Sequence, residues 1–220
     1  MAGRIAYYGN IVTDGLVLNL DAARKDSYNR TGTTWNDISG NGNNGTLTNG
    51  PTFDSEDYGS IVFDGVDDYV DIGSNISNYE IFTTSFWINY NFFDSTWRSP
   101  LGDNSHFYSY HVLYLGGFIY LGVSSNYSGD PYEGVPHGTI NTETWYNFVI
   151  TKNSSNLVSF YKNSILLGSN SKTGGVNINK IGEGYVPDNA LISSVQIHNR
   201  ALTQTEITQN FNALRGRYGI

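Results

Sequence analysis

The chain has 220 residues, with 12 Lys and Arg against 20 Asp and Glu, so its formal net charge is −8. This length suits one large all-β domain with a self-supporting core better than two ordinary domains. Cysteine is absent, which excludes a disulfide framework, a thiolate metal site and a cysteine nucleophile. The acidic balance argues against nucleic acid or an anionic membrane as a partner, because binding phosphate requires clustered Lys and Arg.

The first 14 residues contain one Arg and no long apolar stretch, so they do not read as a secretory signal peptide. No window of the chain is apolar enough for a membrane span, and we expect a protein made in the cytoplasm. We expect residues 1–14 to form an arm outside the main domain, which covers residues 15–220. The apolar residues of this arm alternate too poorly for a sandwich strand, and they could dock by adding to a neighbour's sheet edge. They are Ile5, Tyr7, Tyr8, Ile11 and Val12.

From residue 16 onward the dominant hydrophobic period is two, which is typical of strands with one buried face. Gly, Asn, Asp and Ser separate the runs, as turn residues do. More than ten short strands with no helix between them predict an all-β antiparallel sandwich or jelly roll. The predicted strands are 16–21, 60–64, 69–72, 86–89, 111–115, 118–123, 145–151, 157–161, 165–167, 176–181 and 191–197.

One short α-helix is predicted near the C-terminus, at about 203–214. Thr203 and Glu206 have the spacing of a capping box, in which each side chain binds a backbone amide of the other residue. Ile207, Phe211 and Leu214 then form one apolar stripe, which we expect to lie on the sheet.

Several motifs together are similar to the concanavalin A-like lectin/glucanase superfamily, in its laminin-G-like jelly-roll branch. The resemblance runs over nearly the whole chain from about Asp14, and it implies a jelly-roll fold. This superfamily holds lectins, glucanases, lyases and adhesion modules, so the fold alone does not decide the function. The motifs are DGLVLNLD (14–21), TTWNDISGNGNNGT (33–46), FDGVDDYV (63–70), FWI (86–88) and IHNRALTQTEI (197–207).

Two further stretches, IVTDGLVLNLDAA (11–23) and QNFNALRGRYGI (209–220), resemble structural proteins of tailed bacteriophages, particularly large marine and cyanobacterial ones. That resemblance implies a virion protein whose partners are other virion proteins. Assembly of virions in the host cytoplasm agrees with the missing signal peptide.

Glucanases of this superfamily carry Glu-x-Asp-x-Glu on one strand, where alternation brings the carboxylates to one face. This chain has no such run, because Glu183 has no acidic residue two positions away. A Gly-x-Ser-x-Gly nucleophile elbow is also absent. We therefore expect no catalytic residues and no enzyme activity.

Calcium requires about six to eight oxygen ligands, and two parts of the sequence are rich in them. The competing interpretation is that these are turns, since Asp-Gly and Asn-Gly are turn dipeptides. Relatives often carry Ile-Asp-Asp/Glu-Val in the last strand, whereas this chain has Ser193 and Ser194 in place of those carboxylates. We favour turns, with no cofactor, over a structural calcium site. The calcium candidates are Asp37, Asn41, Asn43, Asp64, Asp67 and Asp68.

Two segments, 92–110 and 124–138, interrupt strands with aromatic, Asp and Asn side chains that a core does not need. Such residues could form a sugar-binding platform, or they could pack against neighbouring copies in an assembly. The candidates for sugar binding are Trp97, Asp103, Asn104, Tyr108, Tyr110, Asn126, Tyr127 and Tyr132.

The sequence thus predicts a concanavalin A-like jelly roll with one C-terminal helix. The leading function is a non-catalytic structural protein on the outside of a tailed-phage virion, as capsid decoration or another outer attachment. The alternative is a carbohydrate-binding adhesin or fibre protein that recognises glycans on the host surface.

Overall fold

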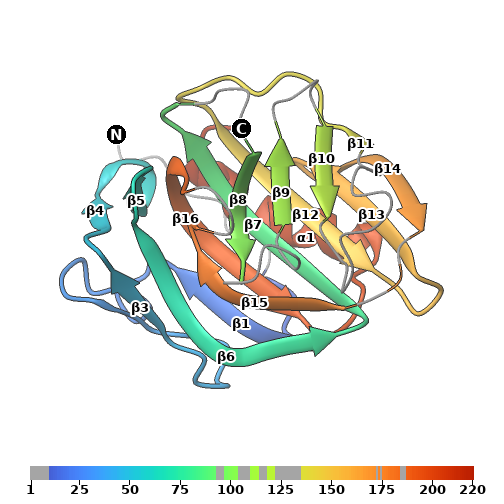
Figure 1. Ribbon diagram of the computed structural model, residues 1–220, viewed down its shortest axis with the longest axis horizontal. Coiled ribbons are helices and arrows are strands. Elements are labelled where there is room, and N and C mark those ends of the chain that lie inside the picture. The colour runs from blue at the N-terminus through green and yellow to red at the C-terminus, as the bar shows by residue number, and fades with distance from the viewer. Residues whose placement is uncertain are drawn as a thin grey trace.

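A computed structural model of the protein describes residues 10–92, 97–103, 110–113, 118–121, 135–171, 173, 175–183 and 187–220. In this part of the chain the strands pair antiparallel and form two sheets stacked face to face, with the helix α1 behind the rear sheet (Figure 1). The predicted antiparallel β-sandwich with one C-terminal helix is therefore confirmed.

Sheet A, the rear sheet in Figure 1, runs β14–β13–β12–β7–β16–β5–β4, and β1 also pairs with β16. Its strands are β1 (Leu16–Asp21), β4 (Thr52–Asp54), β5 (Ser60–Asp64), β7 (Phe82–Tyr90), β12 (Trp145–Lys152), β13 (Leu157–Lys162), β14 (Ile165–Ser171) and β16 (Asn189–His198).

Sheet B, the front sheet, runs β11–β10–β9–β8–β15–β6–β3–β2. Its strands are β2 (Thr34–Trp35), β3 (Gly45–Thr48), β6 (Tyr69–Tyr79), β8 (Trp97–Gly102), β9 (Tyr110–Leu113), β10 (Phe118–Leu121), β11 (Val135–Pro136) and β15 (Val176–Ile181).

The main core lies between the two sheets and is built from the inward residues of both, such as Phe86 and Phe148 of sheet A and Val70 and Ile181 of sheet B. Two smaller apolar clusters lie on the opposite face of sheet A, beneath α1 (Gln204–Leu214). The central strands of sheet A are therefore buried on both faces, whereas β14 at its edge is largely exposed. This is why every residue of β12 is buried although its sequence was expected to alternate between a buried and an exposed face.

The helix begins as predicted. Thr203 accepts a hydrogen bond from the Glu206 backbone, and the Glu206 side chain accepts one from the Thr203 backbone, which completes the capping box. Arg200 binds the same carboxylate through two nitrogens, and this pairing lowers the pKa of Glu206 to about 2. The apolar stripe of Ile207, Phe211 and Leu214 is buried on sheet A, as expected.

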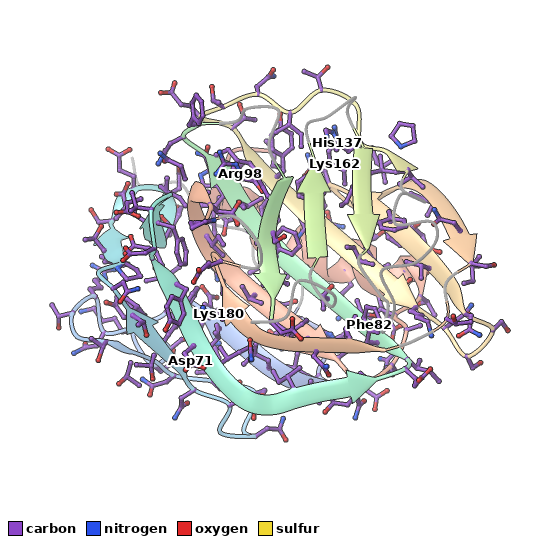
Figure 2. The ribbon with its side chains drawn as sticks, in the orientation of Figure 1. Asp71, Phe82, Arg98, His137, Lys162 and Lys180 are labelled. Carbon is purple, nitrogen blue, oxygen red and sulfur yellow. The ribbon has the colours of Figure 1, made fainter. Side chains whose placement is uncertain are left out.

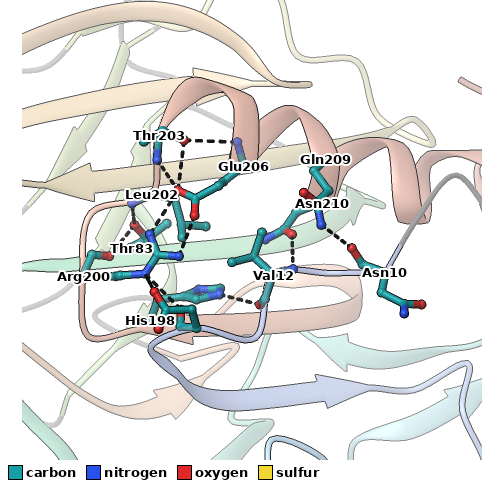
Figure 3. A network of polar contacts seen from close by, with 11 residues as sticks. Asn10, Val12, Thr83, His198, Arg200, Leu202, Thr203, Glu206, Gln209 and Asn210 are labelled. Carbon is teal, nitrogen blue, oxygen red and sulfur yellow. Dashed lines mark hydrogen bonds and ion pairs between the residues drawn. The ribbon is translucent and has the colours of Figure 1, made fainter.

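Residues 10–13, which we call the strap, lie across α1 and β16 (Figure 3). The Val12 backbone donates its N–H to Asn210 Oδ1 at 2.8 Å, and its carbonyl accepts a hydrogen bond from His198 Nε2 at 3.0 Å. The Val12 side chain is buried with Leu202 and Ile207. The strap is therefore part of the domain's own packing.

This position corrects the predicted arm. Val12 was expected in a segment outside the sandwich, but its side chain and both backbone groups are used within the domain. Ile11 beside it is half-buried. Ile5, Tyr7 and Tyr8 lie outside the described residues, so docking by the arm stays a prediction for residues 1–9.

The predicted strands from residue 16 onward coincide with observed strands wherever the structure describes them. The runs at 69–72, 86–89 and 165–167 underestimate β6, β7 and β14, which are longer at one or both ends. None of the described helices combines the length and the apolar character needed to cross a bilayer.

Candidate functional site

The outer face of sheet A is covered over its central strands, although β14 at its edge stays largely exposed. The Trp87 ring lies 5.5 Å from the Phe211 ring and 4.2 Å from the Tyr218 ring, measured between centroids, and Val149 is buried beneath the strap and α1. On sheet B, by contrast, outward residues of β2, β3 and β6 are exposed. The outer face of sheet B therefore offers a ligand an exposed surface across these strands.

A row of polar side chains crosses four neighbouring strands of this face. Thr34 of β2 pairs with Thr46 of β3, which pairs with Asp71 of β6, which in turn pairs with Lys180 of β15. Since paired residues of neighbouring strands share a face, these four side chains stand side by side. We call Thr34, Thr46, Asp71 and Lys180 the polar row.

The residues next to the row confirm which way it faces. The residue beside each of three row members is buried in the core between the sheets. These neighbours are Leu47, Val70 and Ile181. Because successive side chains of a strand point to opposite faces, the row points outward. Asp71 on β6 and Lys180 on β15 are labelled in Figure 2.

Lys180 is held on two sides. Its Nζ donates to Glu183 Oε2 at 2.8 Å and lies 3.8 Å from the centroid of the Tyr69 ring. Tyr69 stands two residues before Asp71, so its ring belongs to the same face. One side of this ring is therefore covered by an ammonium group, and the row has a rigid, half-buried end.

Asp71 is exposed, and its carboxylate is fixed in position. Oδ1 accepts a hydrogen bond from the Gly73 backbone at 2.7 Å. Gly73 has φ +71°, a left-handed conformation that glycine adopts without strain. It lies within β6 where the register with β15 shifts, and this irregularity brings its N–H back to Asp71. Oδ2 is left as an acceptor, and the row can thus bind ligand hydroxyls through one carboxylate oxygen and two threonine hydroxyls.

Most of the sugar-binding residues predicted from the sequence fall outside the described residues. Trp97 and Tyr110 are described through their backbones, as the first residues of β8 and β9. β8 is the neighbour of β15, so Trp97 lies in the strand next to Lys180. The residues outside the description are Asn104, Tyr108, Asn126, Tyr127 and Tyr132.

Asp103 was predicted to bind sugar, but it is only 7% exposed and takes part in interactions of the interior. Nearby in the chain, Arg98 is buried and donates from Nη1 to the Pro187 carbonyl at 2.6 Å. Asp188 is fully buried, and burial raises its pKa to about 8 although the positive charge of Arg98 opposes this shift. Burial also raises the pKa of Tyr90, whose phenol interacts with Asp188. These groups hold the two sheets together and are closed to a ligand.

The calcium candidates Asp64, Asp67 and Asp68 do come together, with ligand oxygens all within 4.8 Å of one another. Asp68 is buried, and burial raises its pKa, as do the negative charges of Asp64 and Asp67. Its Oδ2 accepts from the Asp64 backbone at 3.0 Å, and Asp64 Oδ1 accepts from Val66 at 2.8 Å. The carboxylates thus close the turn between β5 and β6. They supply fewer oxygens than calcium usually takes, and the preference for turns over a calcium site stays a prediction.

The other calcium candidates cover the free edge of β1. Asp37 Oδ1 accepts from the backbones of Asn19 and Ser39, and Oδ2 accepts from the Asn43 backbone and the Ser39 hydroxyl, all within 3.0 Å. A carboxylate has about four lone-pair positions, so Asp37 has none left for a metal ion.

The two asparagines of this loop act in the same way. Asn41 Nδ2 donates to the Leu16 carbonyl at 3.0 Å, and Asn43 Nδ2 donates to the Val17 carbonyl at 2.7 Å. Side chains therefore replace the missing neighbour strand along β1. An edge strand covered in this way cannot pair with another chain.

The polar row was missed by the sequence analysis. Its residues come from four strands between positions 34 and 180. Asp71 and Lys180 are polar residues of predicted period-two runs, whereas Thr34 and Thr46 lie in short strands that were not predicted. Alternation shows that each faces outward, but strand order decides that they are neighbours. The sequence carries no local signal for that order.

Comparisons with known proteins agree with this fold. The family model described as "Concanavalin A-like lectin/glucanases superfamily" matches residues 64–208. A search of curated proteins by sequence finds no match. Among solved structures, domain 4 of an extracellular arabinanase from Geobacillus stearothermophilus, in complex with arabinotriose, has a TM-score of 0.69 and 16% identity over 89% of this chain and 97% of that one.

Two other similar structures belong to larger proteins. A Trypanosoma rangeli sialidase mutant has a TM-score of 0.67 and 15% identity over 94% of this chain, which spans 34% of the sialidase. The binding domain of Paraclostridial mosquitocidal protein 1 has a TM-score of 0.64 and 20% identity over 91% of this chain and 52% of that one. At these identities the likeness concerns the fold. The family match covers well over half of the chain, and this protein belongs to the concanavalin A-like lectin/glucanase superfamily.

Proposed function

We propose that this protein is a non-catalytic carbohydrate-binding domain and that its ligand lies on the polar row of sheet B. The observation that carries this proposal is the one-sided cover of the sandwich. The helix and the strap cover the central strands of sheet A, whereas Thr34, Thr46 and Asp71 stand exposed on sheet B. Hydroxyl and carboxylate groups in a row are suited to bind the hydroxyl groups of a sugar chain.

The similar structures support a sugar ligand. One is a domain in complex with arabinotriose, and another is the binding domain of a botulinum neurotoxin in complex with SialylT. Their shared fold makes carbohydrate a reasonable ligand class for this chain, and the polar row supplies the chemistry. The sequence lacks the Glu-x-Asp-x-Glu run of the superfamily's glucanases, which supports binding without catalysis.

The predicted aromatic segments would extend this site. The row reaches β8 at Gly102, the partner of Lys180, and Trp97 stands five positions away at the other end of that strand. Only a ligand that also follows β8 would reach it. Trp97→Ala or Tyr132→Ala should then weaken binding if either ring stacks on a sugar.

The finer proposal places the domain on the outside of a tailed-phage particle, docked through residues 1–9. It rests on the sequence resemblance at the two ends of the chain. At the C-terminal end, Phe211, Leu214 and Tyr218 are buried against sheet A, so packing within the domain accounts for that part of the resemblance. Gold-labelled antibody against the protein, applied to purified particles, would test this location directly.

The test of sugar binding uses the protein displayed in many copies, because a single weak site gains measurable affinity through avidity. We expect saturable binding to a glycan panel, competed by free sugar. Asp71→Ala should reduce binding by about tenfold or more, since it removes a charged hydrogen-bond acceptor.

Asp54→Ala is the matched control. Asp54 Oδ1 accepts from the Glu56 backbone in the same local geometry as Asp71 with Gly73, but Asp54 lies on β4 of sheet A. This variant should bind like the wild type. Loss of binding in both variants, or in neither, would remove the polar row as the ligand site.

A further inference from the structure

We infer that the glycan bound by the polar row is an uncharged oligosaccharide and not one that carries sialic acid, uronic acid or sulfate. This inference rests on the proposed function, because it names the class of glycan that the same face would accept. The evidence is that the positively charged side chains already have partners. We consider Lys180 on the row first and then the other cations of the described chain.

Lys180 is the cation of the polar row, and its ammonium group is already paired within the protein. Its Nζ is 2.8 Å from Glu183 Oε2 and stacks on the Tyr69 ring, and its side chain is only 16% exposed. A sugar carboxylate would have to displace Glu183 before it could pair with Lys180. Such an exchange replaces one ion pair with another and leaves Glu183 without a partner, so it favours no anionic ligand.

None of the other described cations belongs to the polar row, and most of them already have an oxygen partner. Sites for carboxylate or sulfate groups usually present an Arg or Lys whose donors are available. Among the described cations, Lys25 is the exception in having no oxygen or ring partner. The others and their partners are Arg24 with Asp26, Arg30 with Phe53, Arg98 with Pro187, Lys152 with Glu80 and Asn156, Lys162 with His137 and Thr139, Arg200 with Asp14 and Glu206, Arg215 with Phe211, and Arg217 with Asp21.

The acidic groups of the row act against an anion as well. Asp71 is exposed at the centre of the row, and the chain carries a formal net charge of −8. A ligand carboxylate close to Asp71 would be repelled, because two like charges a few ångströms apart interact unfavourably even in water. Neutral hydroxyl groups can instead donate to Asp71 Oδ2 without such a cost.

The length of the row favours a chain of sugars over a single ring. Neighbouring strands lie about 4.8 Å apart, so the four strands from β2 to β15 span about 14 Å. A ligand that touches both Thr34 and Lys180 must therefore be an oligosaccharide lying across the strands. The strand register thus sets the direction and the minimum length of the bound sugar chain. The charges of Lys180 and Asp71 determine that this chain is uncharged.

The first experiment compares matched glycans that differ only in a sialic acid, uronate or sulfate group, at low ionic strength. We expect the neutral member of each pair to bind at least about tenfold more tightly. Asp71→Asn, which keeps the shape and removes the charge, should narrow that difference. Equal or tighter binding of the acidic members would overturn the inference while leaving the proposed function intact, whereas binding to no glycan of either class would overturn the proposed function itself.

The second experiment is a gain of function. Glu183→Gln removes the carboxylate that neutralises Lys180, and it should raise binding of the acidic members by about tenfold at low salt, with the gain shrinking as salt screens the charge. Glu143→Gln makes the same change of charge on an exposed residue before β12. It should leave the ratio of affinities for the neutral and acidic members of each pair unchanged. If Glu183→Gln behaved like Glu143→Gln, neutralisation of Lys180 could not be the reason for the preference.

Discussion

Burial moves the pKa of single groups in this domain far from the ordinary range, and Asp188 is one such group. It is fully buried at the start of β16, and burial raises its pKa from 3.8 to about 8. Between these values the folded protein holds a proton that the unfolded chain has lost. The contribution of Asp188 to stability is therefore complete below pH 3.8 and is lost as the pH rises through about 8.

Asp188→Asn keeps the shape of the side chain but cannot ionise. We expect the free energy of unfolding of the wild type to fall between pH 5 and pH 8.5 by on the order of 3 kcal/mol more than that of the variant. Urea unfolding at both pH values measures this difference. Asp26→Asn, at an exposed ion pair with Arg24, serves as the control. An equal fall in wild type and Asp188→Asn would show that Asp188 is ionised in the folded protein.

His198 should produce the opposite pH dependence. Its Nε2–H donates to the Val12 carbonyl, and burial lowers its pKa below 6.5, as does the nearby charge of Arg200, while Asp14 and Glu206 act to raise it. Its contribution is complete above pH 6.5 and is lost as the pH falls towards the folded value.

His198→Gln keeps a donor for Val12 without a titrating ring. From pH 7.5 to pH 5.0 the wild type should lose more stability than this variant, because the buried ring takes up its proton less readily than the same ring in the unfolded chain. Chemical unfolding followed by tryptophan fluorescence would measure the two slopes. Identical slopes would mean that His198 takes up its proton in the folded state as easily as in the unfolded chain.

At the scale of elements, the edge of β1 shows how side chains can replace a strand. Asp37 binds three backbone amides and one hydroxyl, and Asn41 and Asn43 bind carbonyls of β1. The motif looked like a group of oxygen ligands in the sequence. Its oxygens are instead used by the loop and by the strand edge.

Asp37→Ala leaves those amides without their acceptor. We expect a loss of about 2 kcal/mol in the free energy of unfolding, since unsatisfied polar groups cost about 1–3 kcal/mol each when buried and these are partly exposed. Asp26→Ala, which removes only an exposed ion pair, should cost less than about 0.5 kcal/mol. Because Asp37 has no lone pair left for a metal ion, the loss should be the same with calcium and with EDTA. A cost that appeared only in calcium would restore the metal interpretation.

At the scale of the whole molecule, the strap and α1 decide which face of the sandwich stays open. The strap buries Val12 against Leu202 and Ile207, and Gln209 Nε2 holds the Asn10 carbonyl at 2.7 Å. The two chain ends therefore cooperate to cover sheet A. Sheet B is left for a ligand.

Two truncations separate the strap from the residues before it. Removal of residues 1–9 should leave the midpoint of thermal unfolding unchanged. Removal of residues 1–13 should lower the free energy of unfolding by about 2–4 kcal/mol, because it empties the position of Val12 and leaves His198 and Asn210 without their partners. If both truncations were equally destabilising, the boundary of the strap would be wrong. If residues 1–9 dock the protein on a particle, the shorter truncation alone should also prevent incorporation.

The strands and the helix could be predicted because their signals are local. Period-two runs marked β1, β5, β12, β13 and β15, and the capping box of Thr203 with Glu206 marked the start of α1. Very short strands such as β2 and β11 were missed, since two residues contain no period. β12 was expected to alternate, yet it is buried throughout because a second layer covers it.

The sequence by itself therefore determined the fold class, the helix and its cap, and the superfamily, all of which depend on residues close together in the chain. Only the tertiary structure decided that Val12 belongs to the core, that Asp37 covers a strand edge, and that the polar row exists. Asp37 reaches back only 18 residues to the Asn19 amide, but Val12 and the polar row depend on which segments become neighbours across more than a hundred residues. That order is set by the packing of whole sheets, and alternation along one strand carries no information about it.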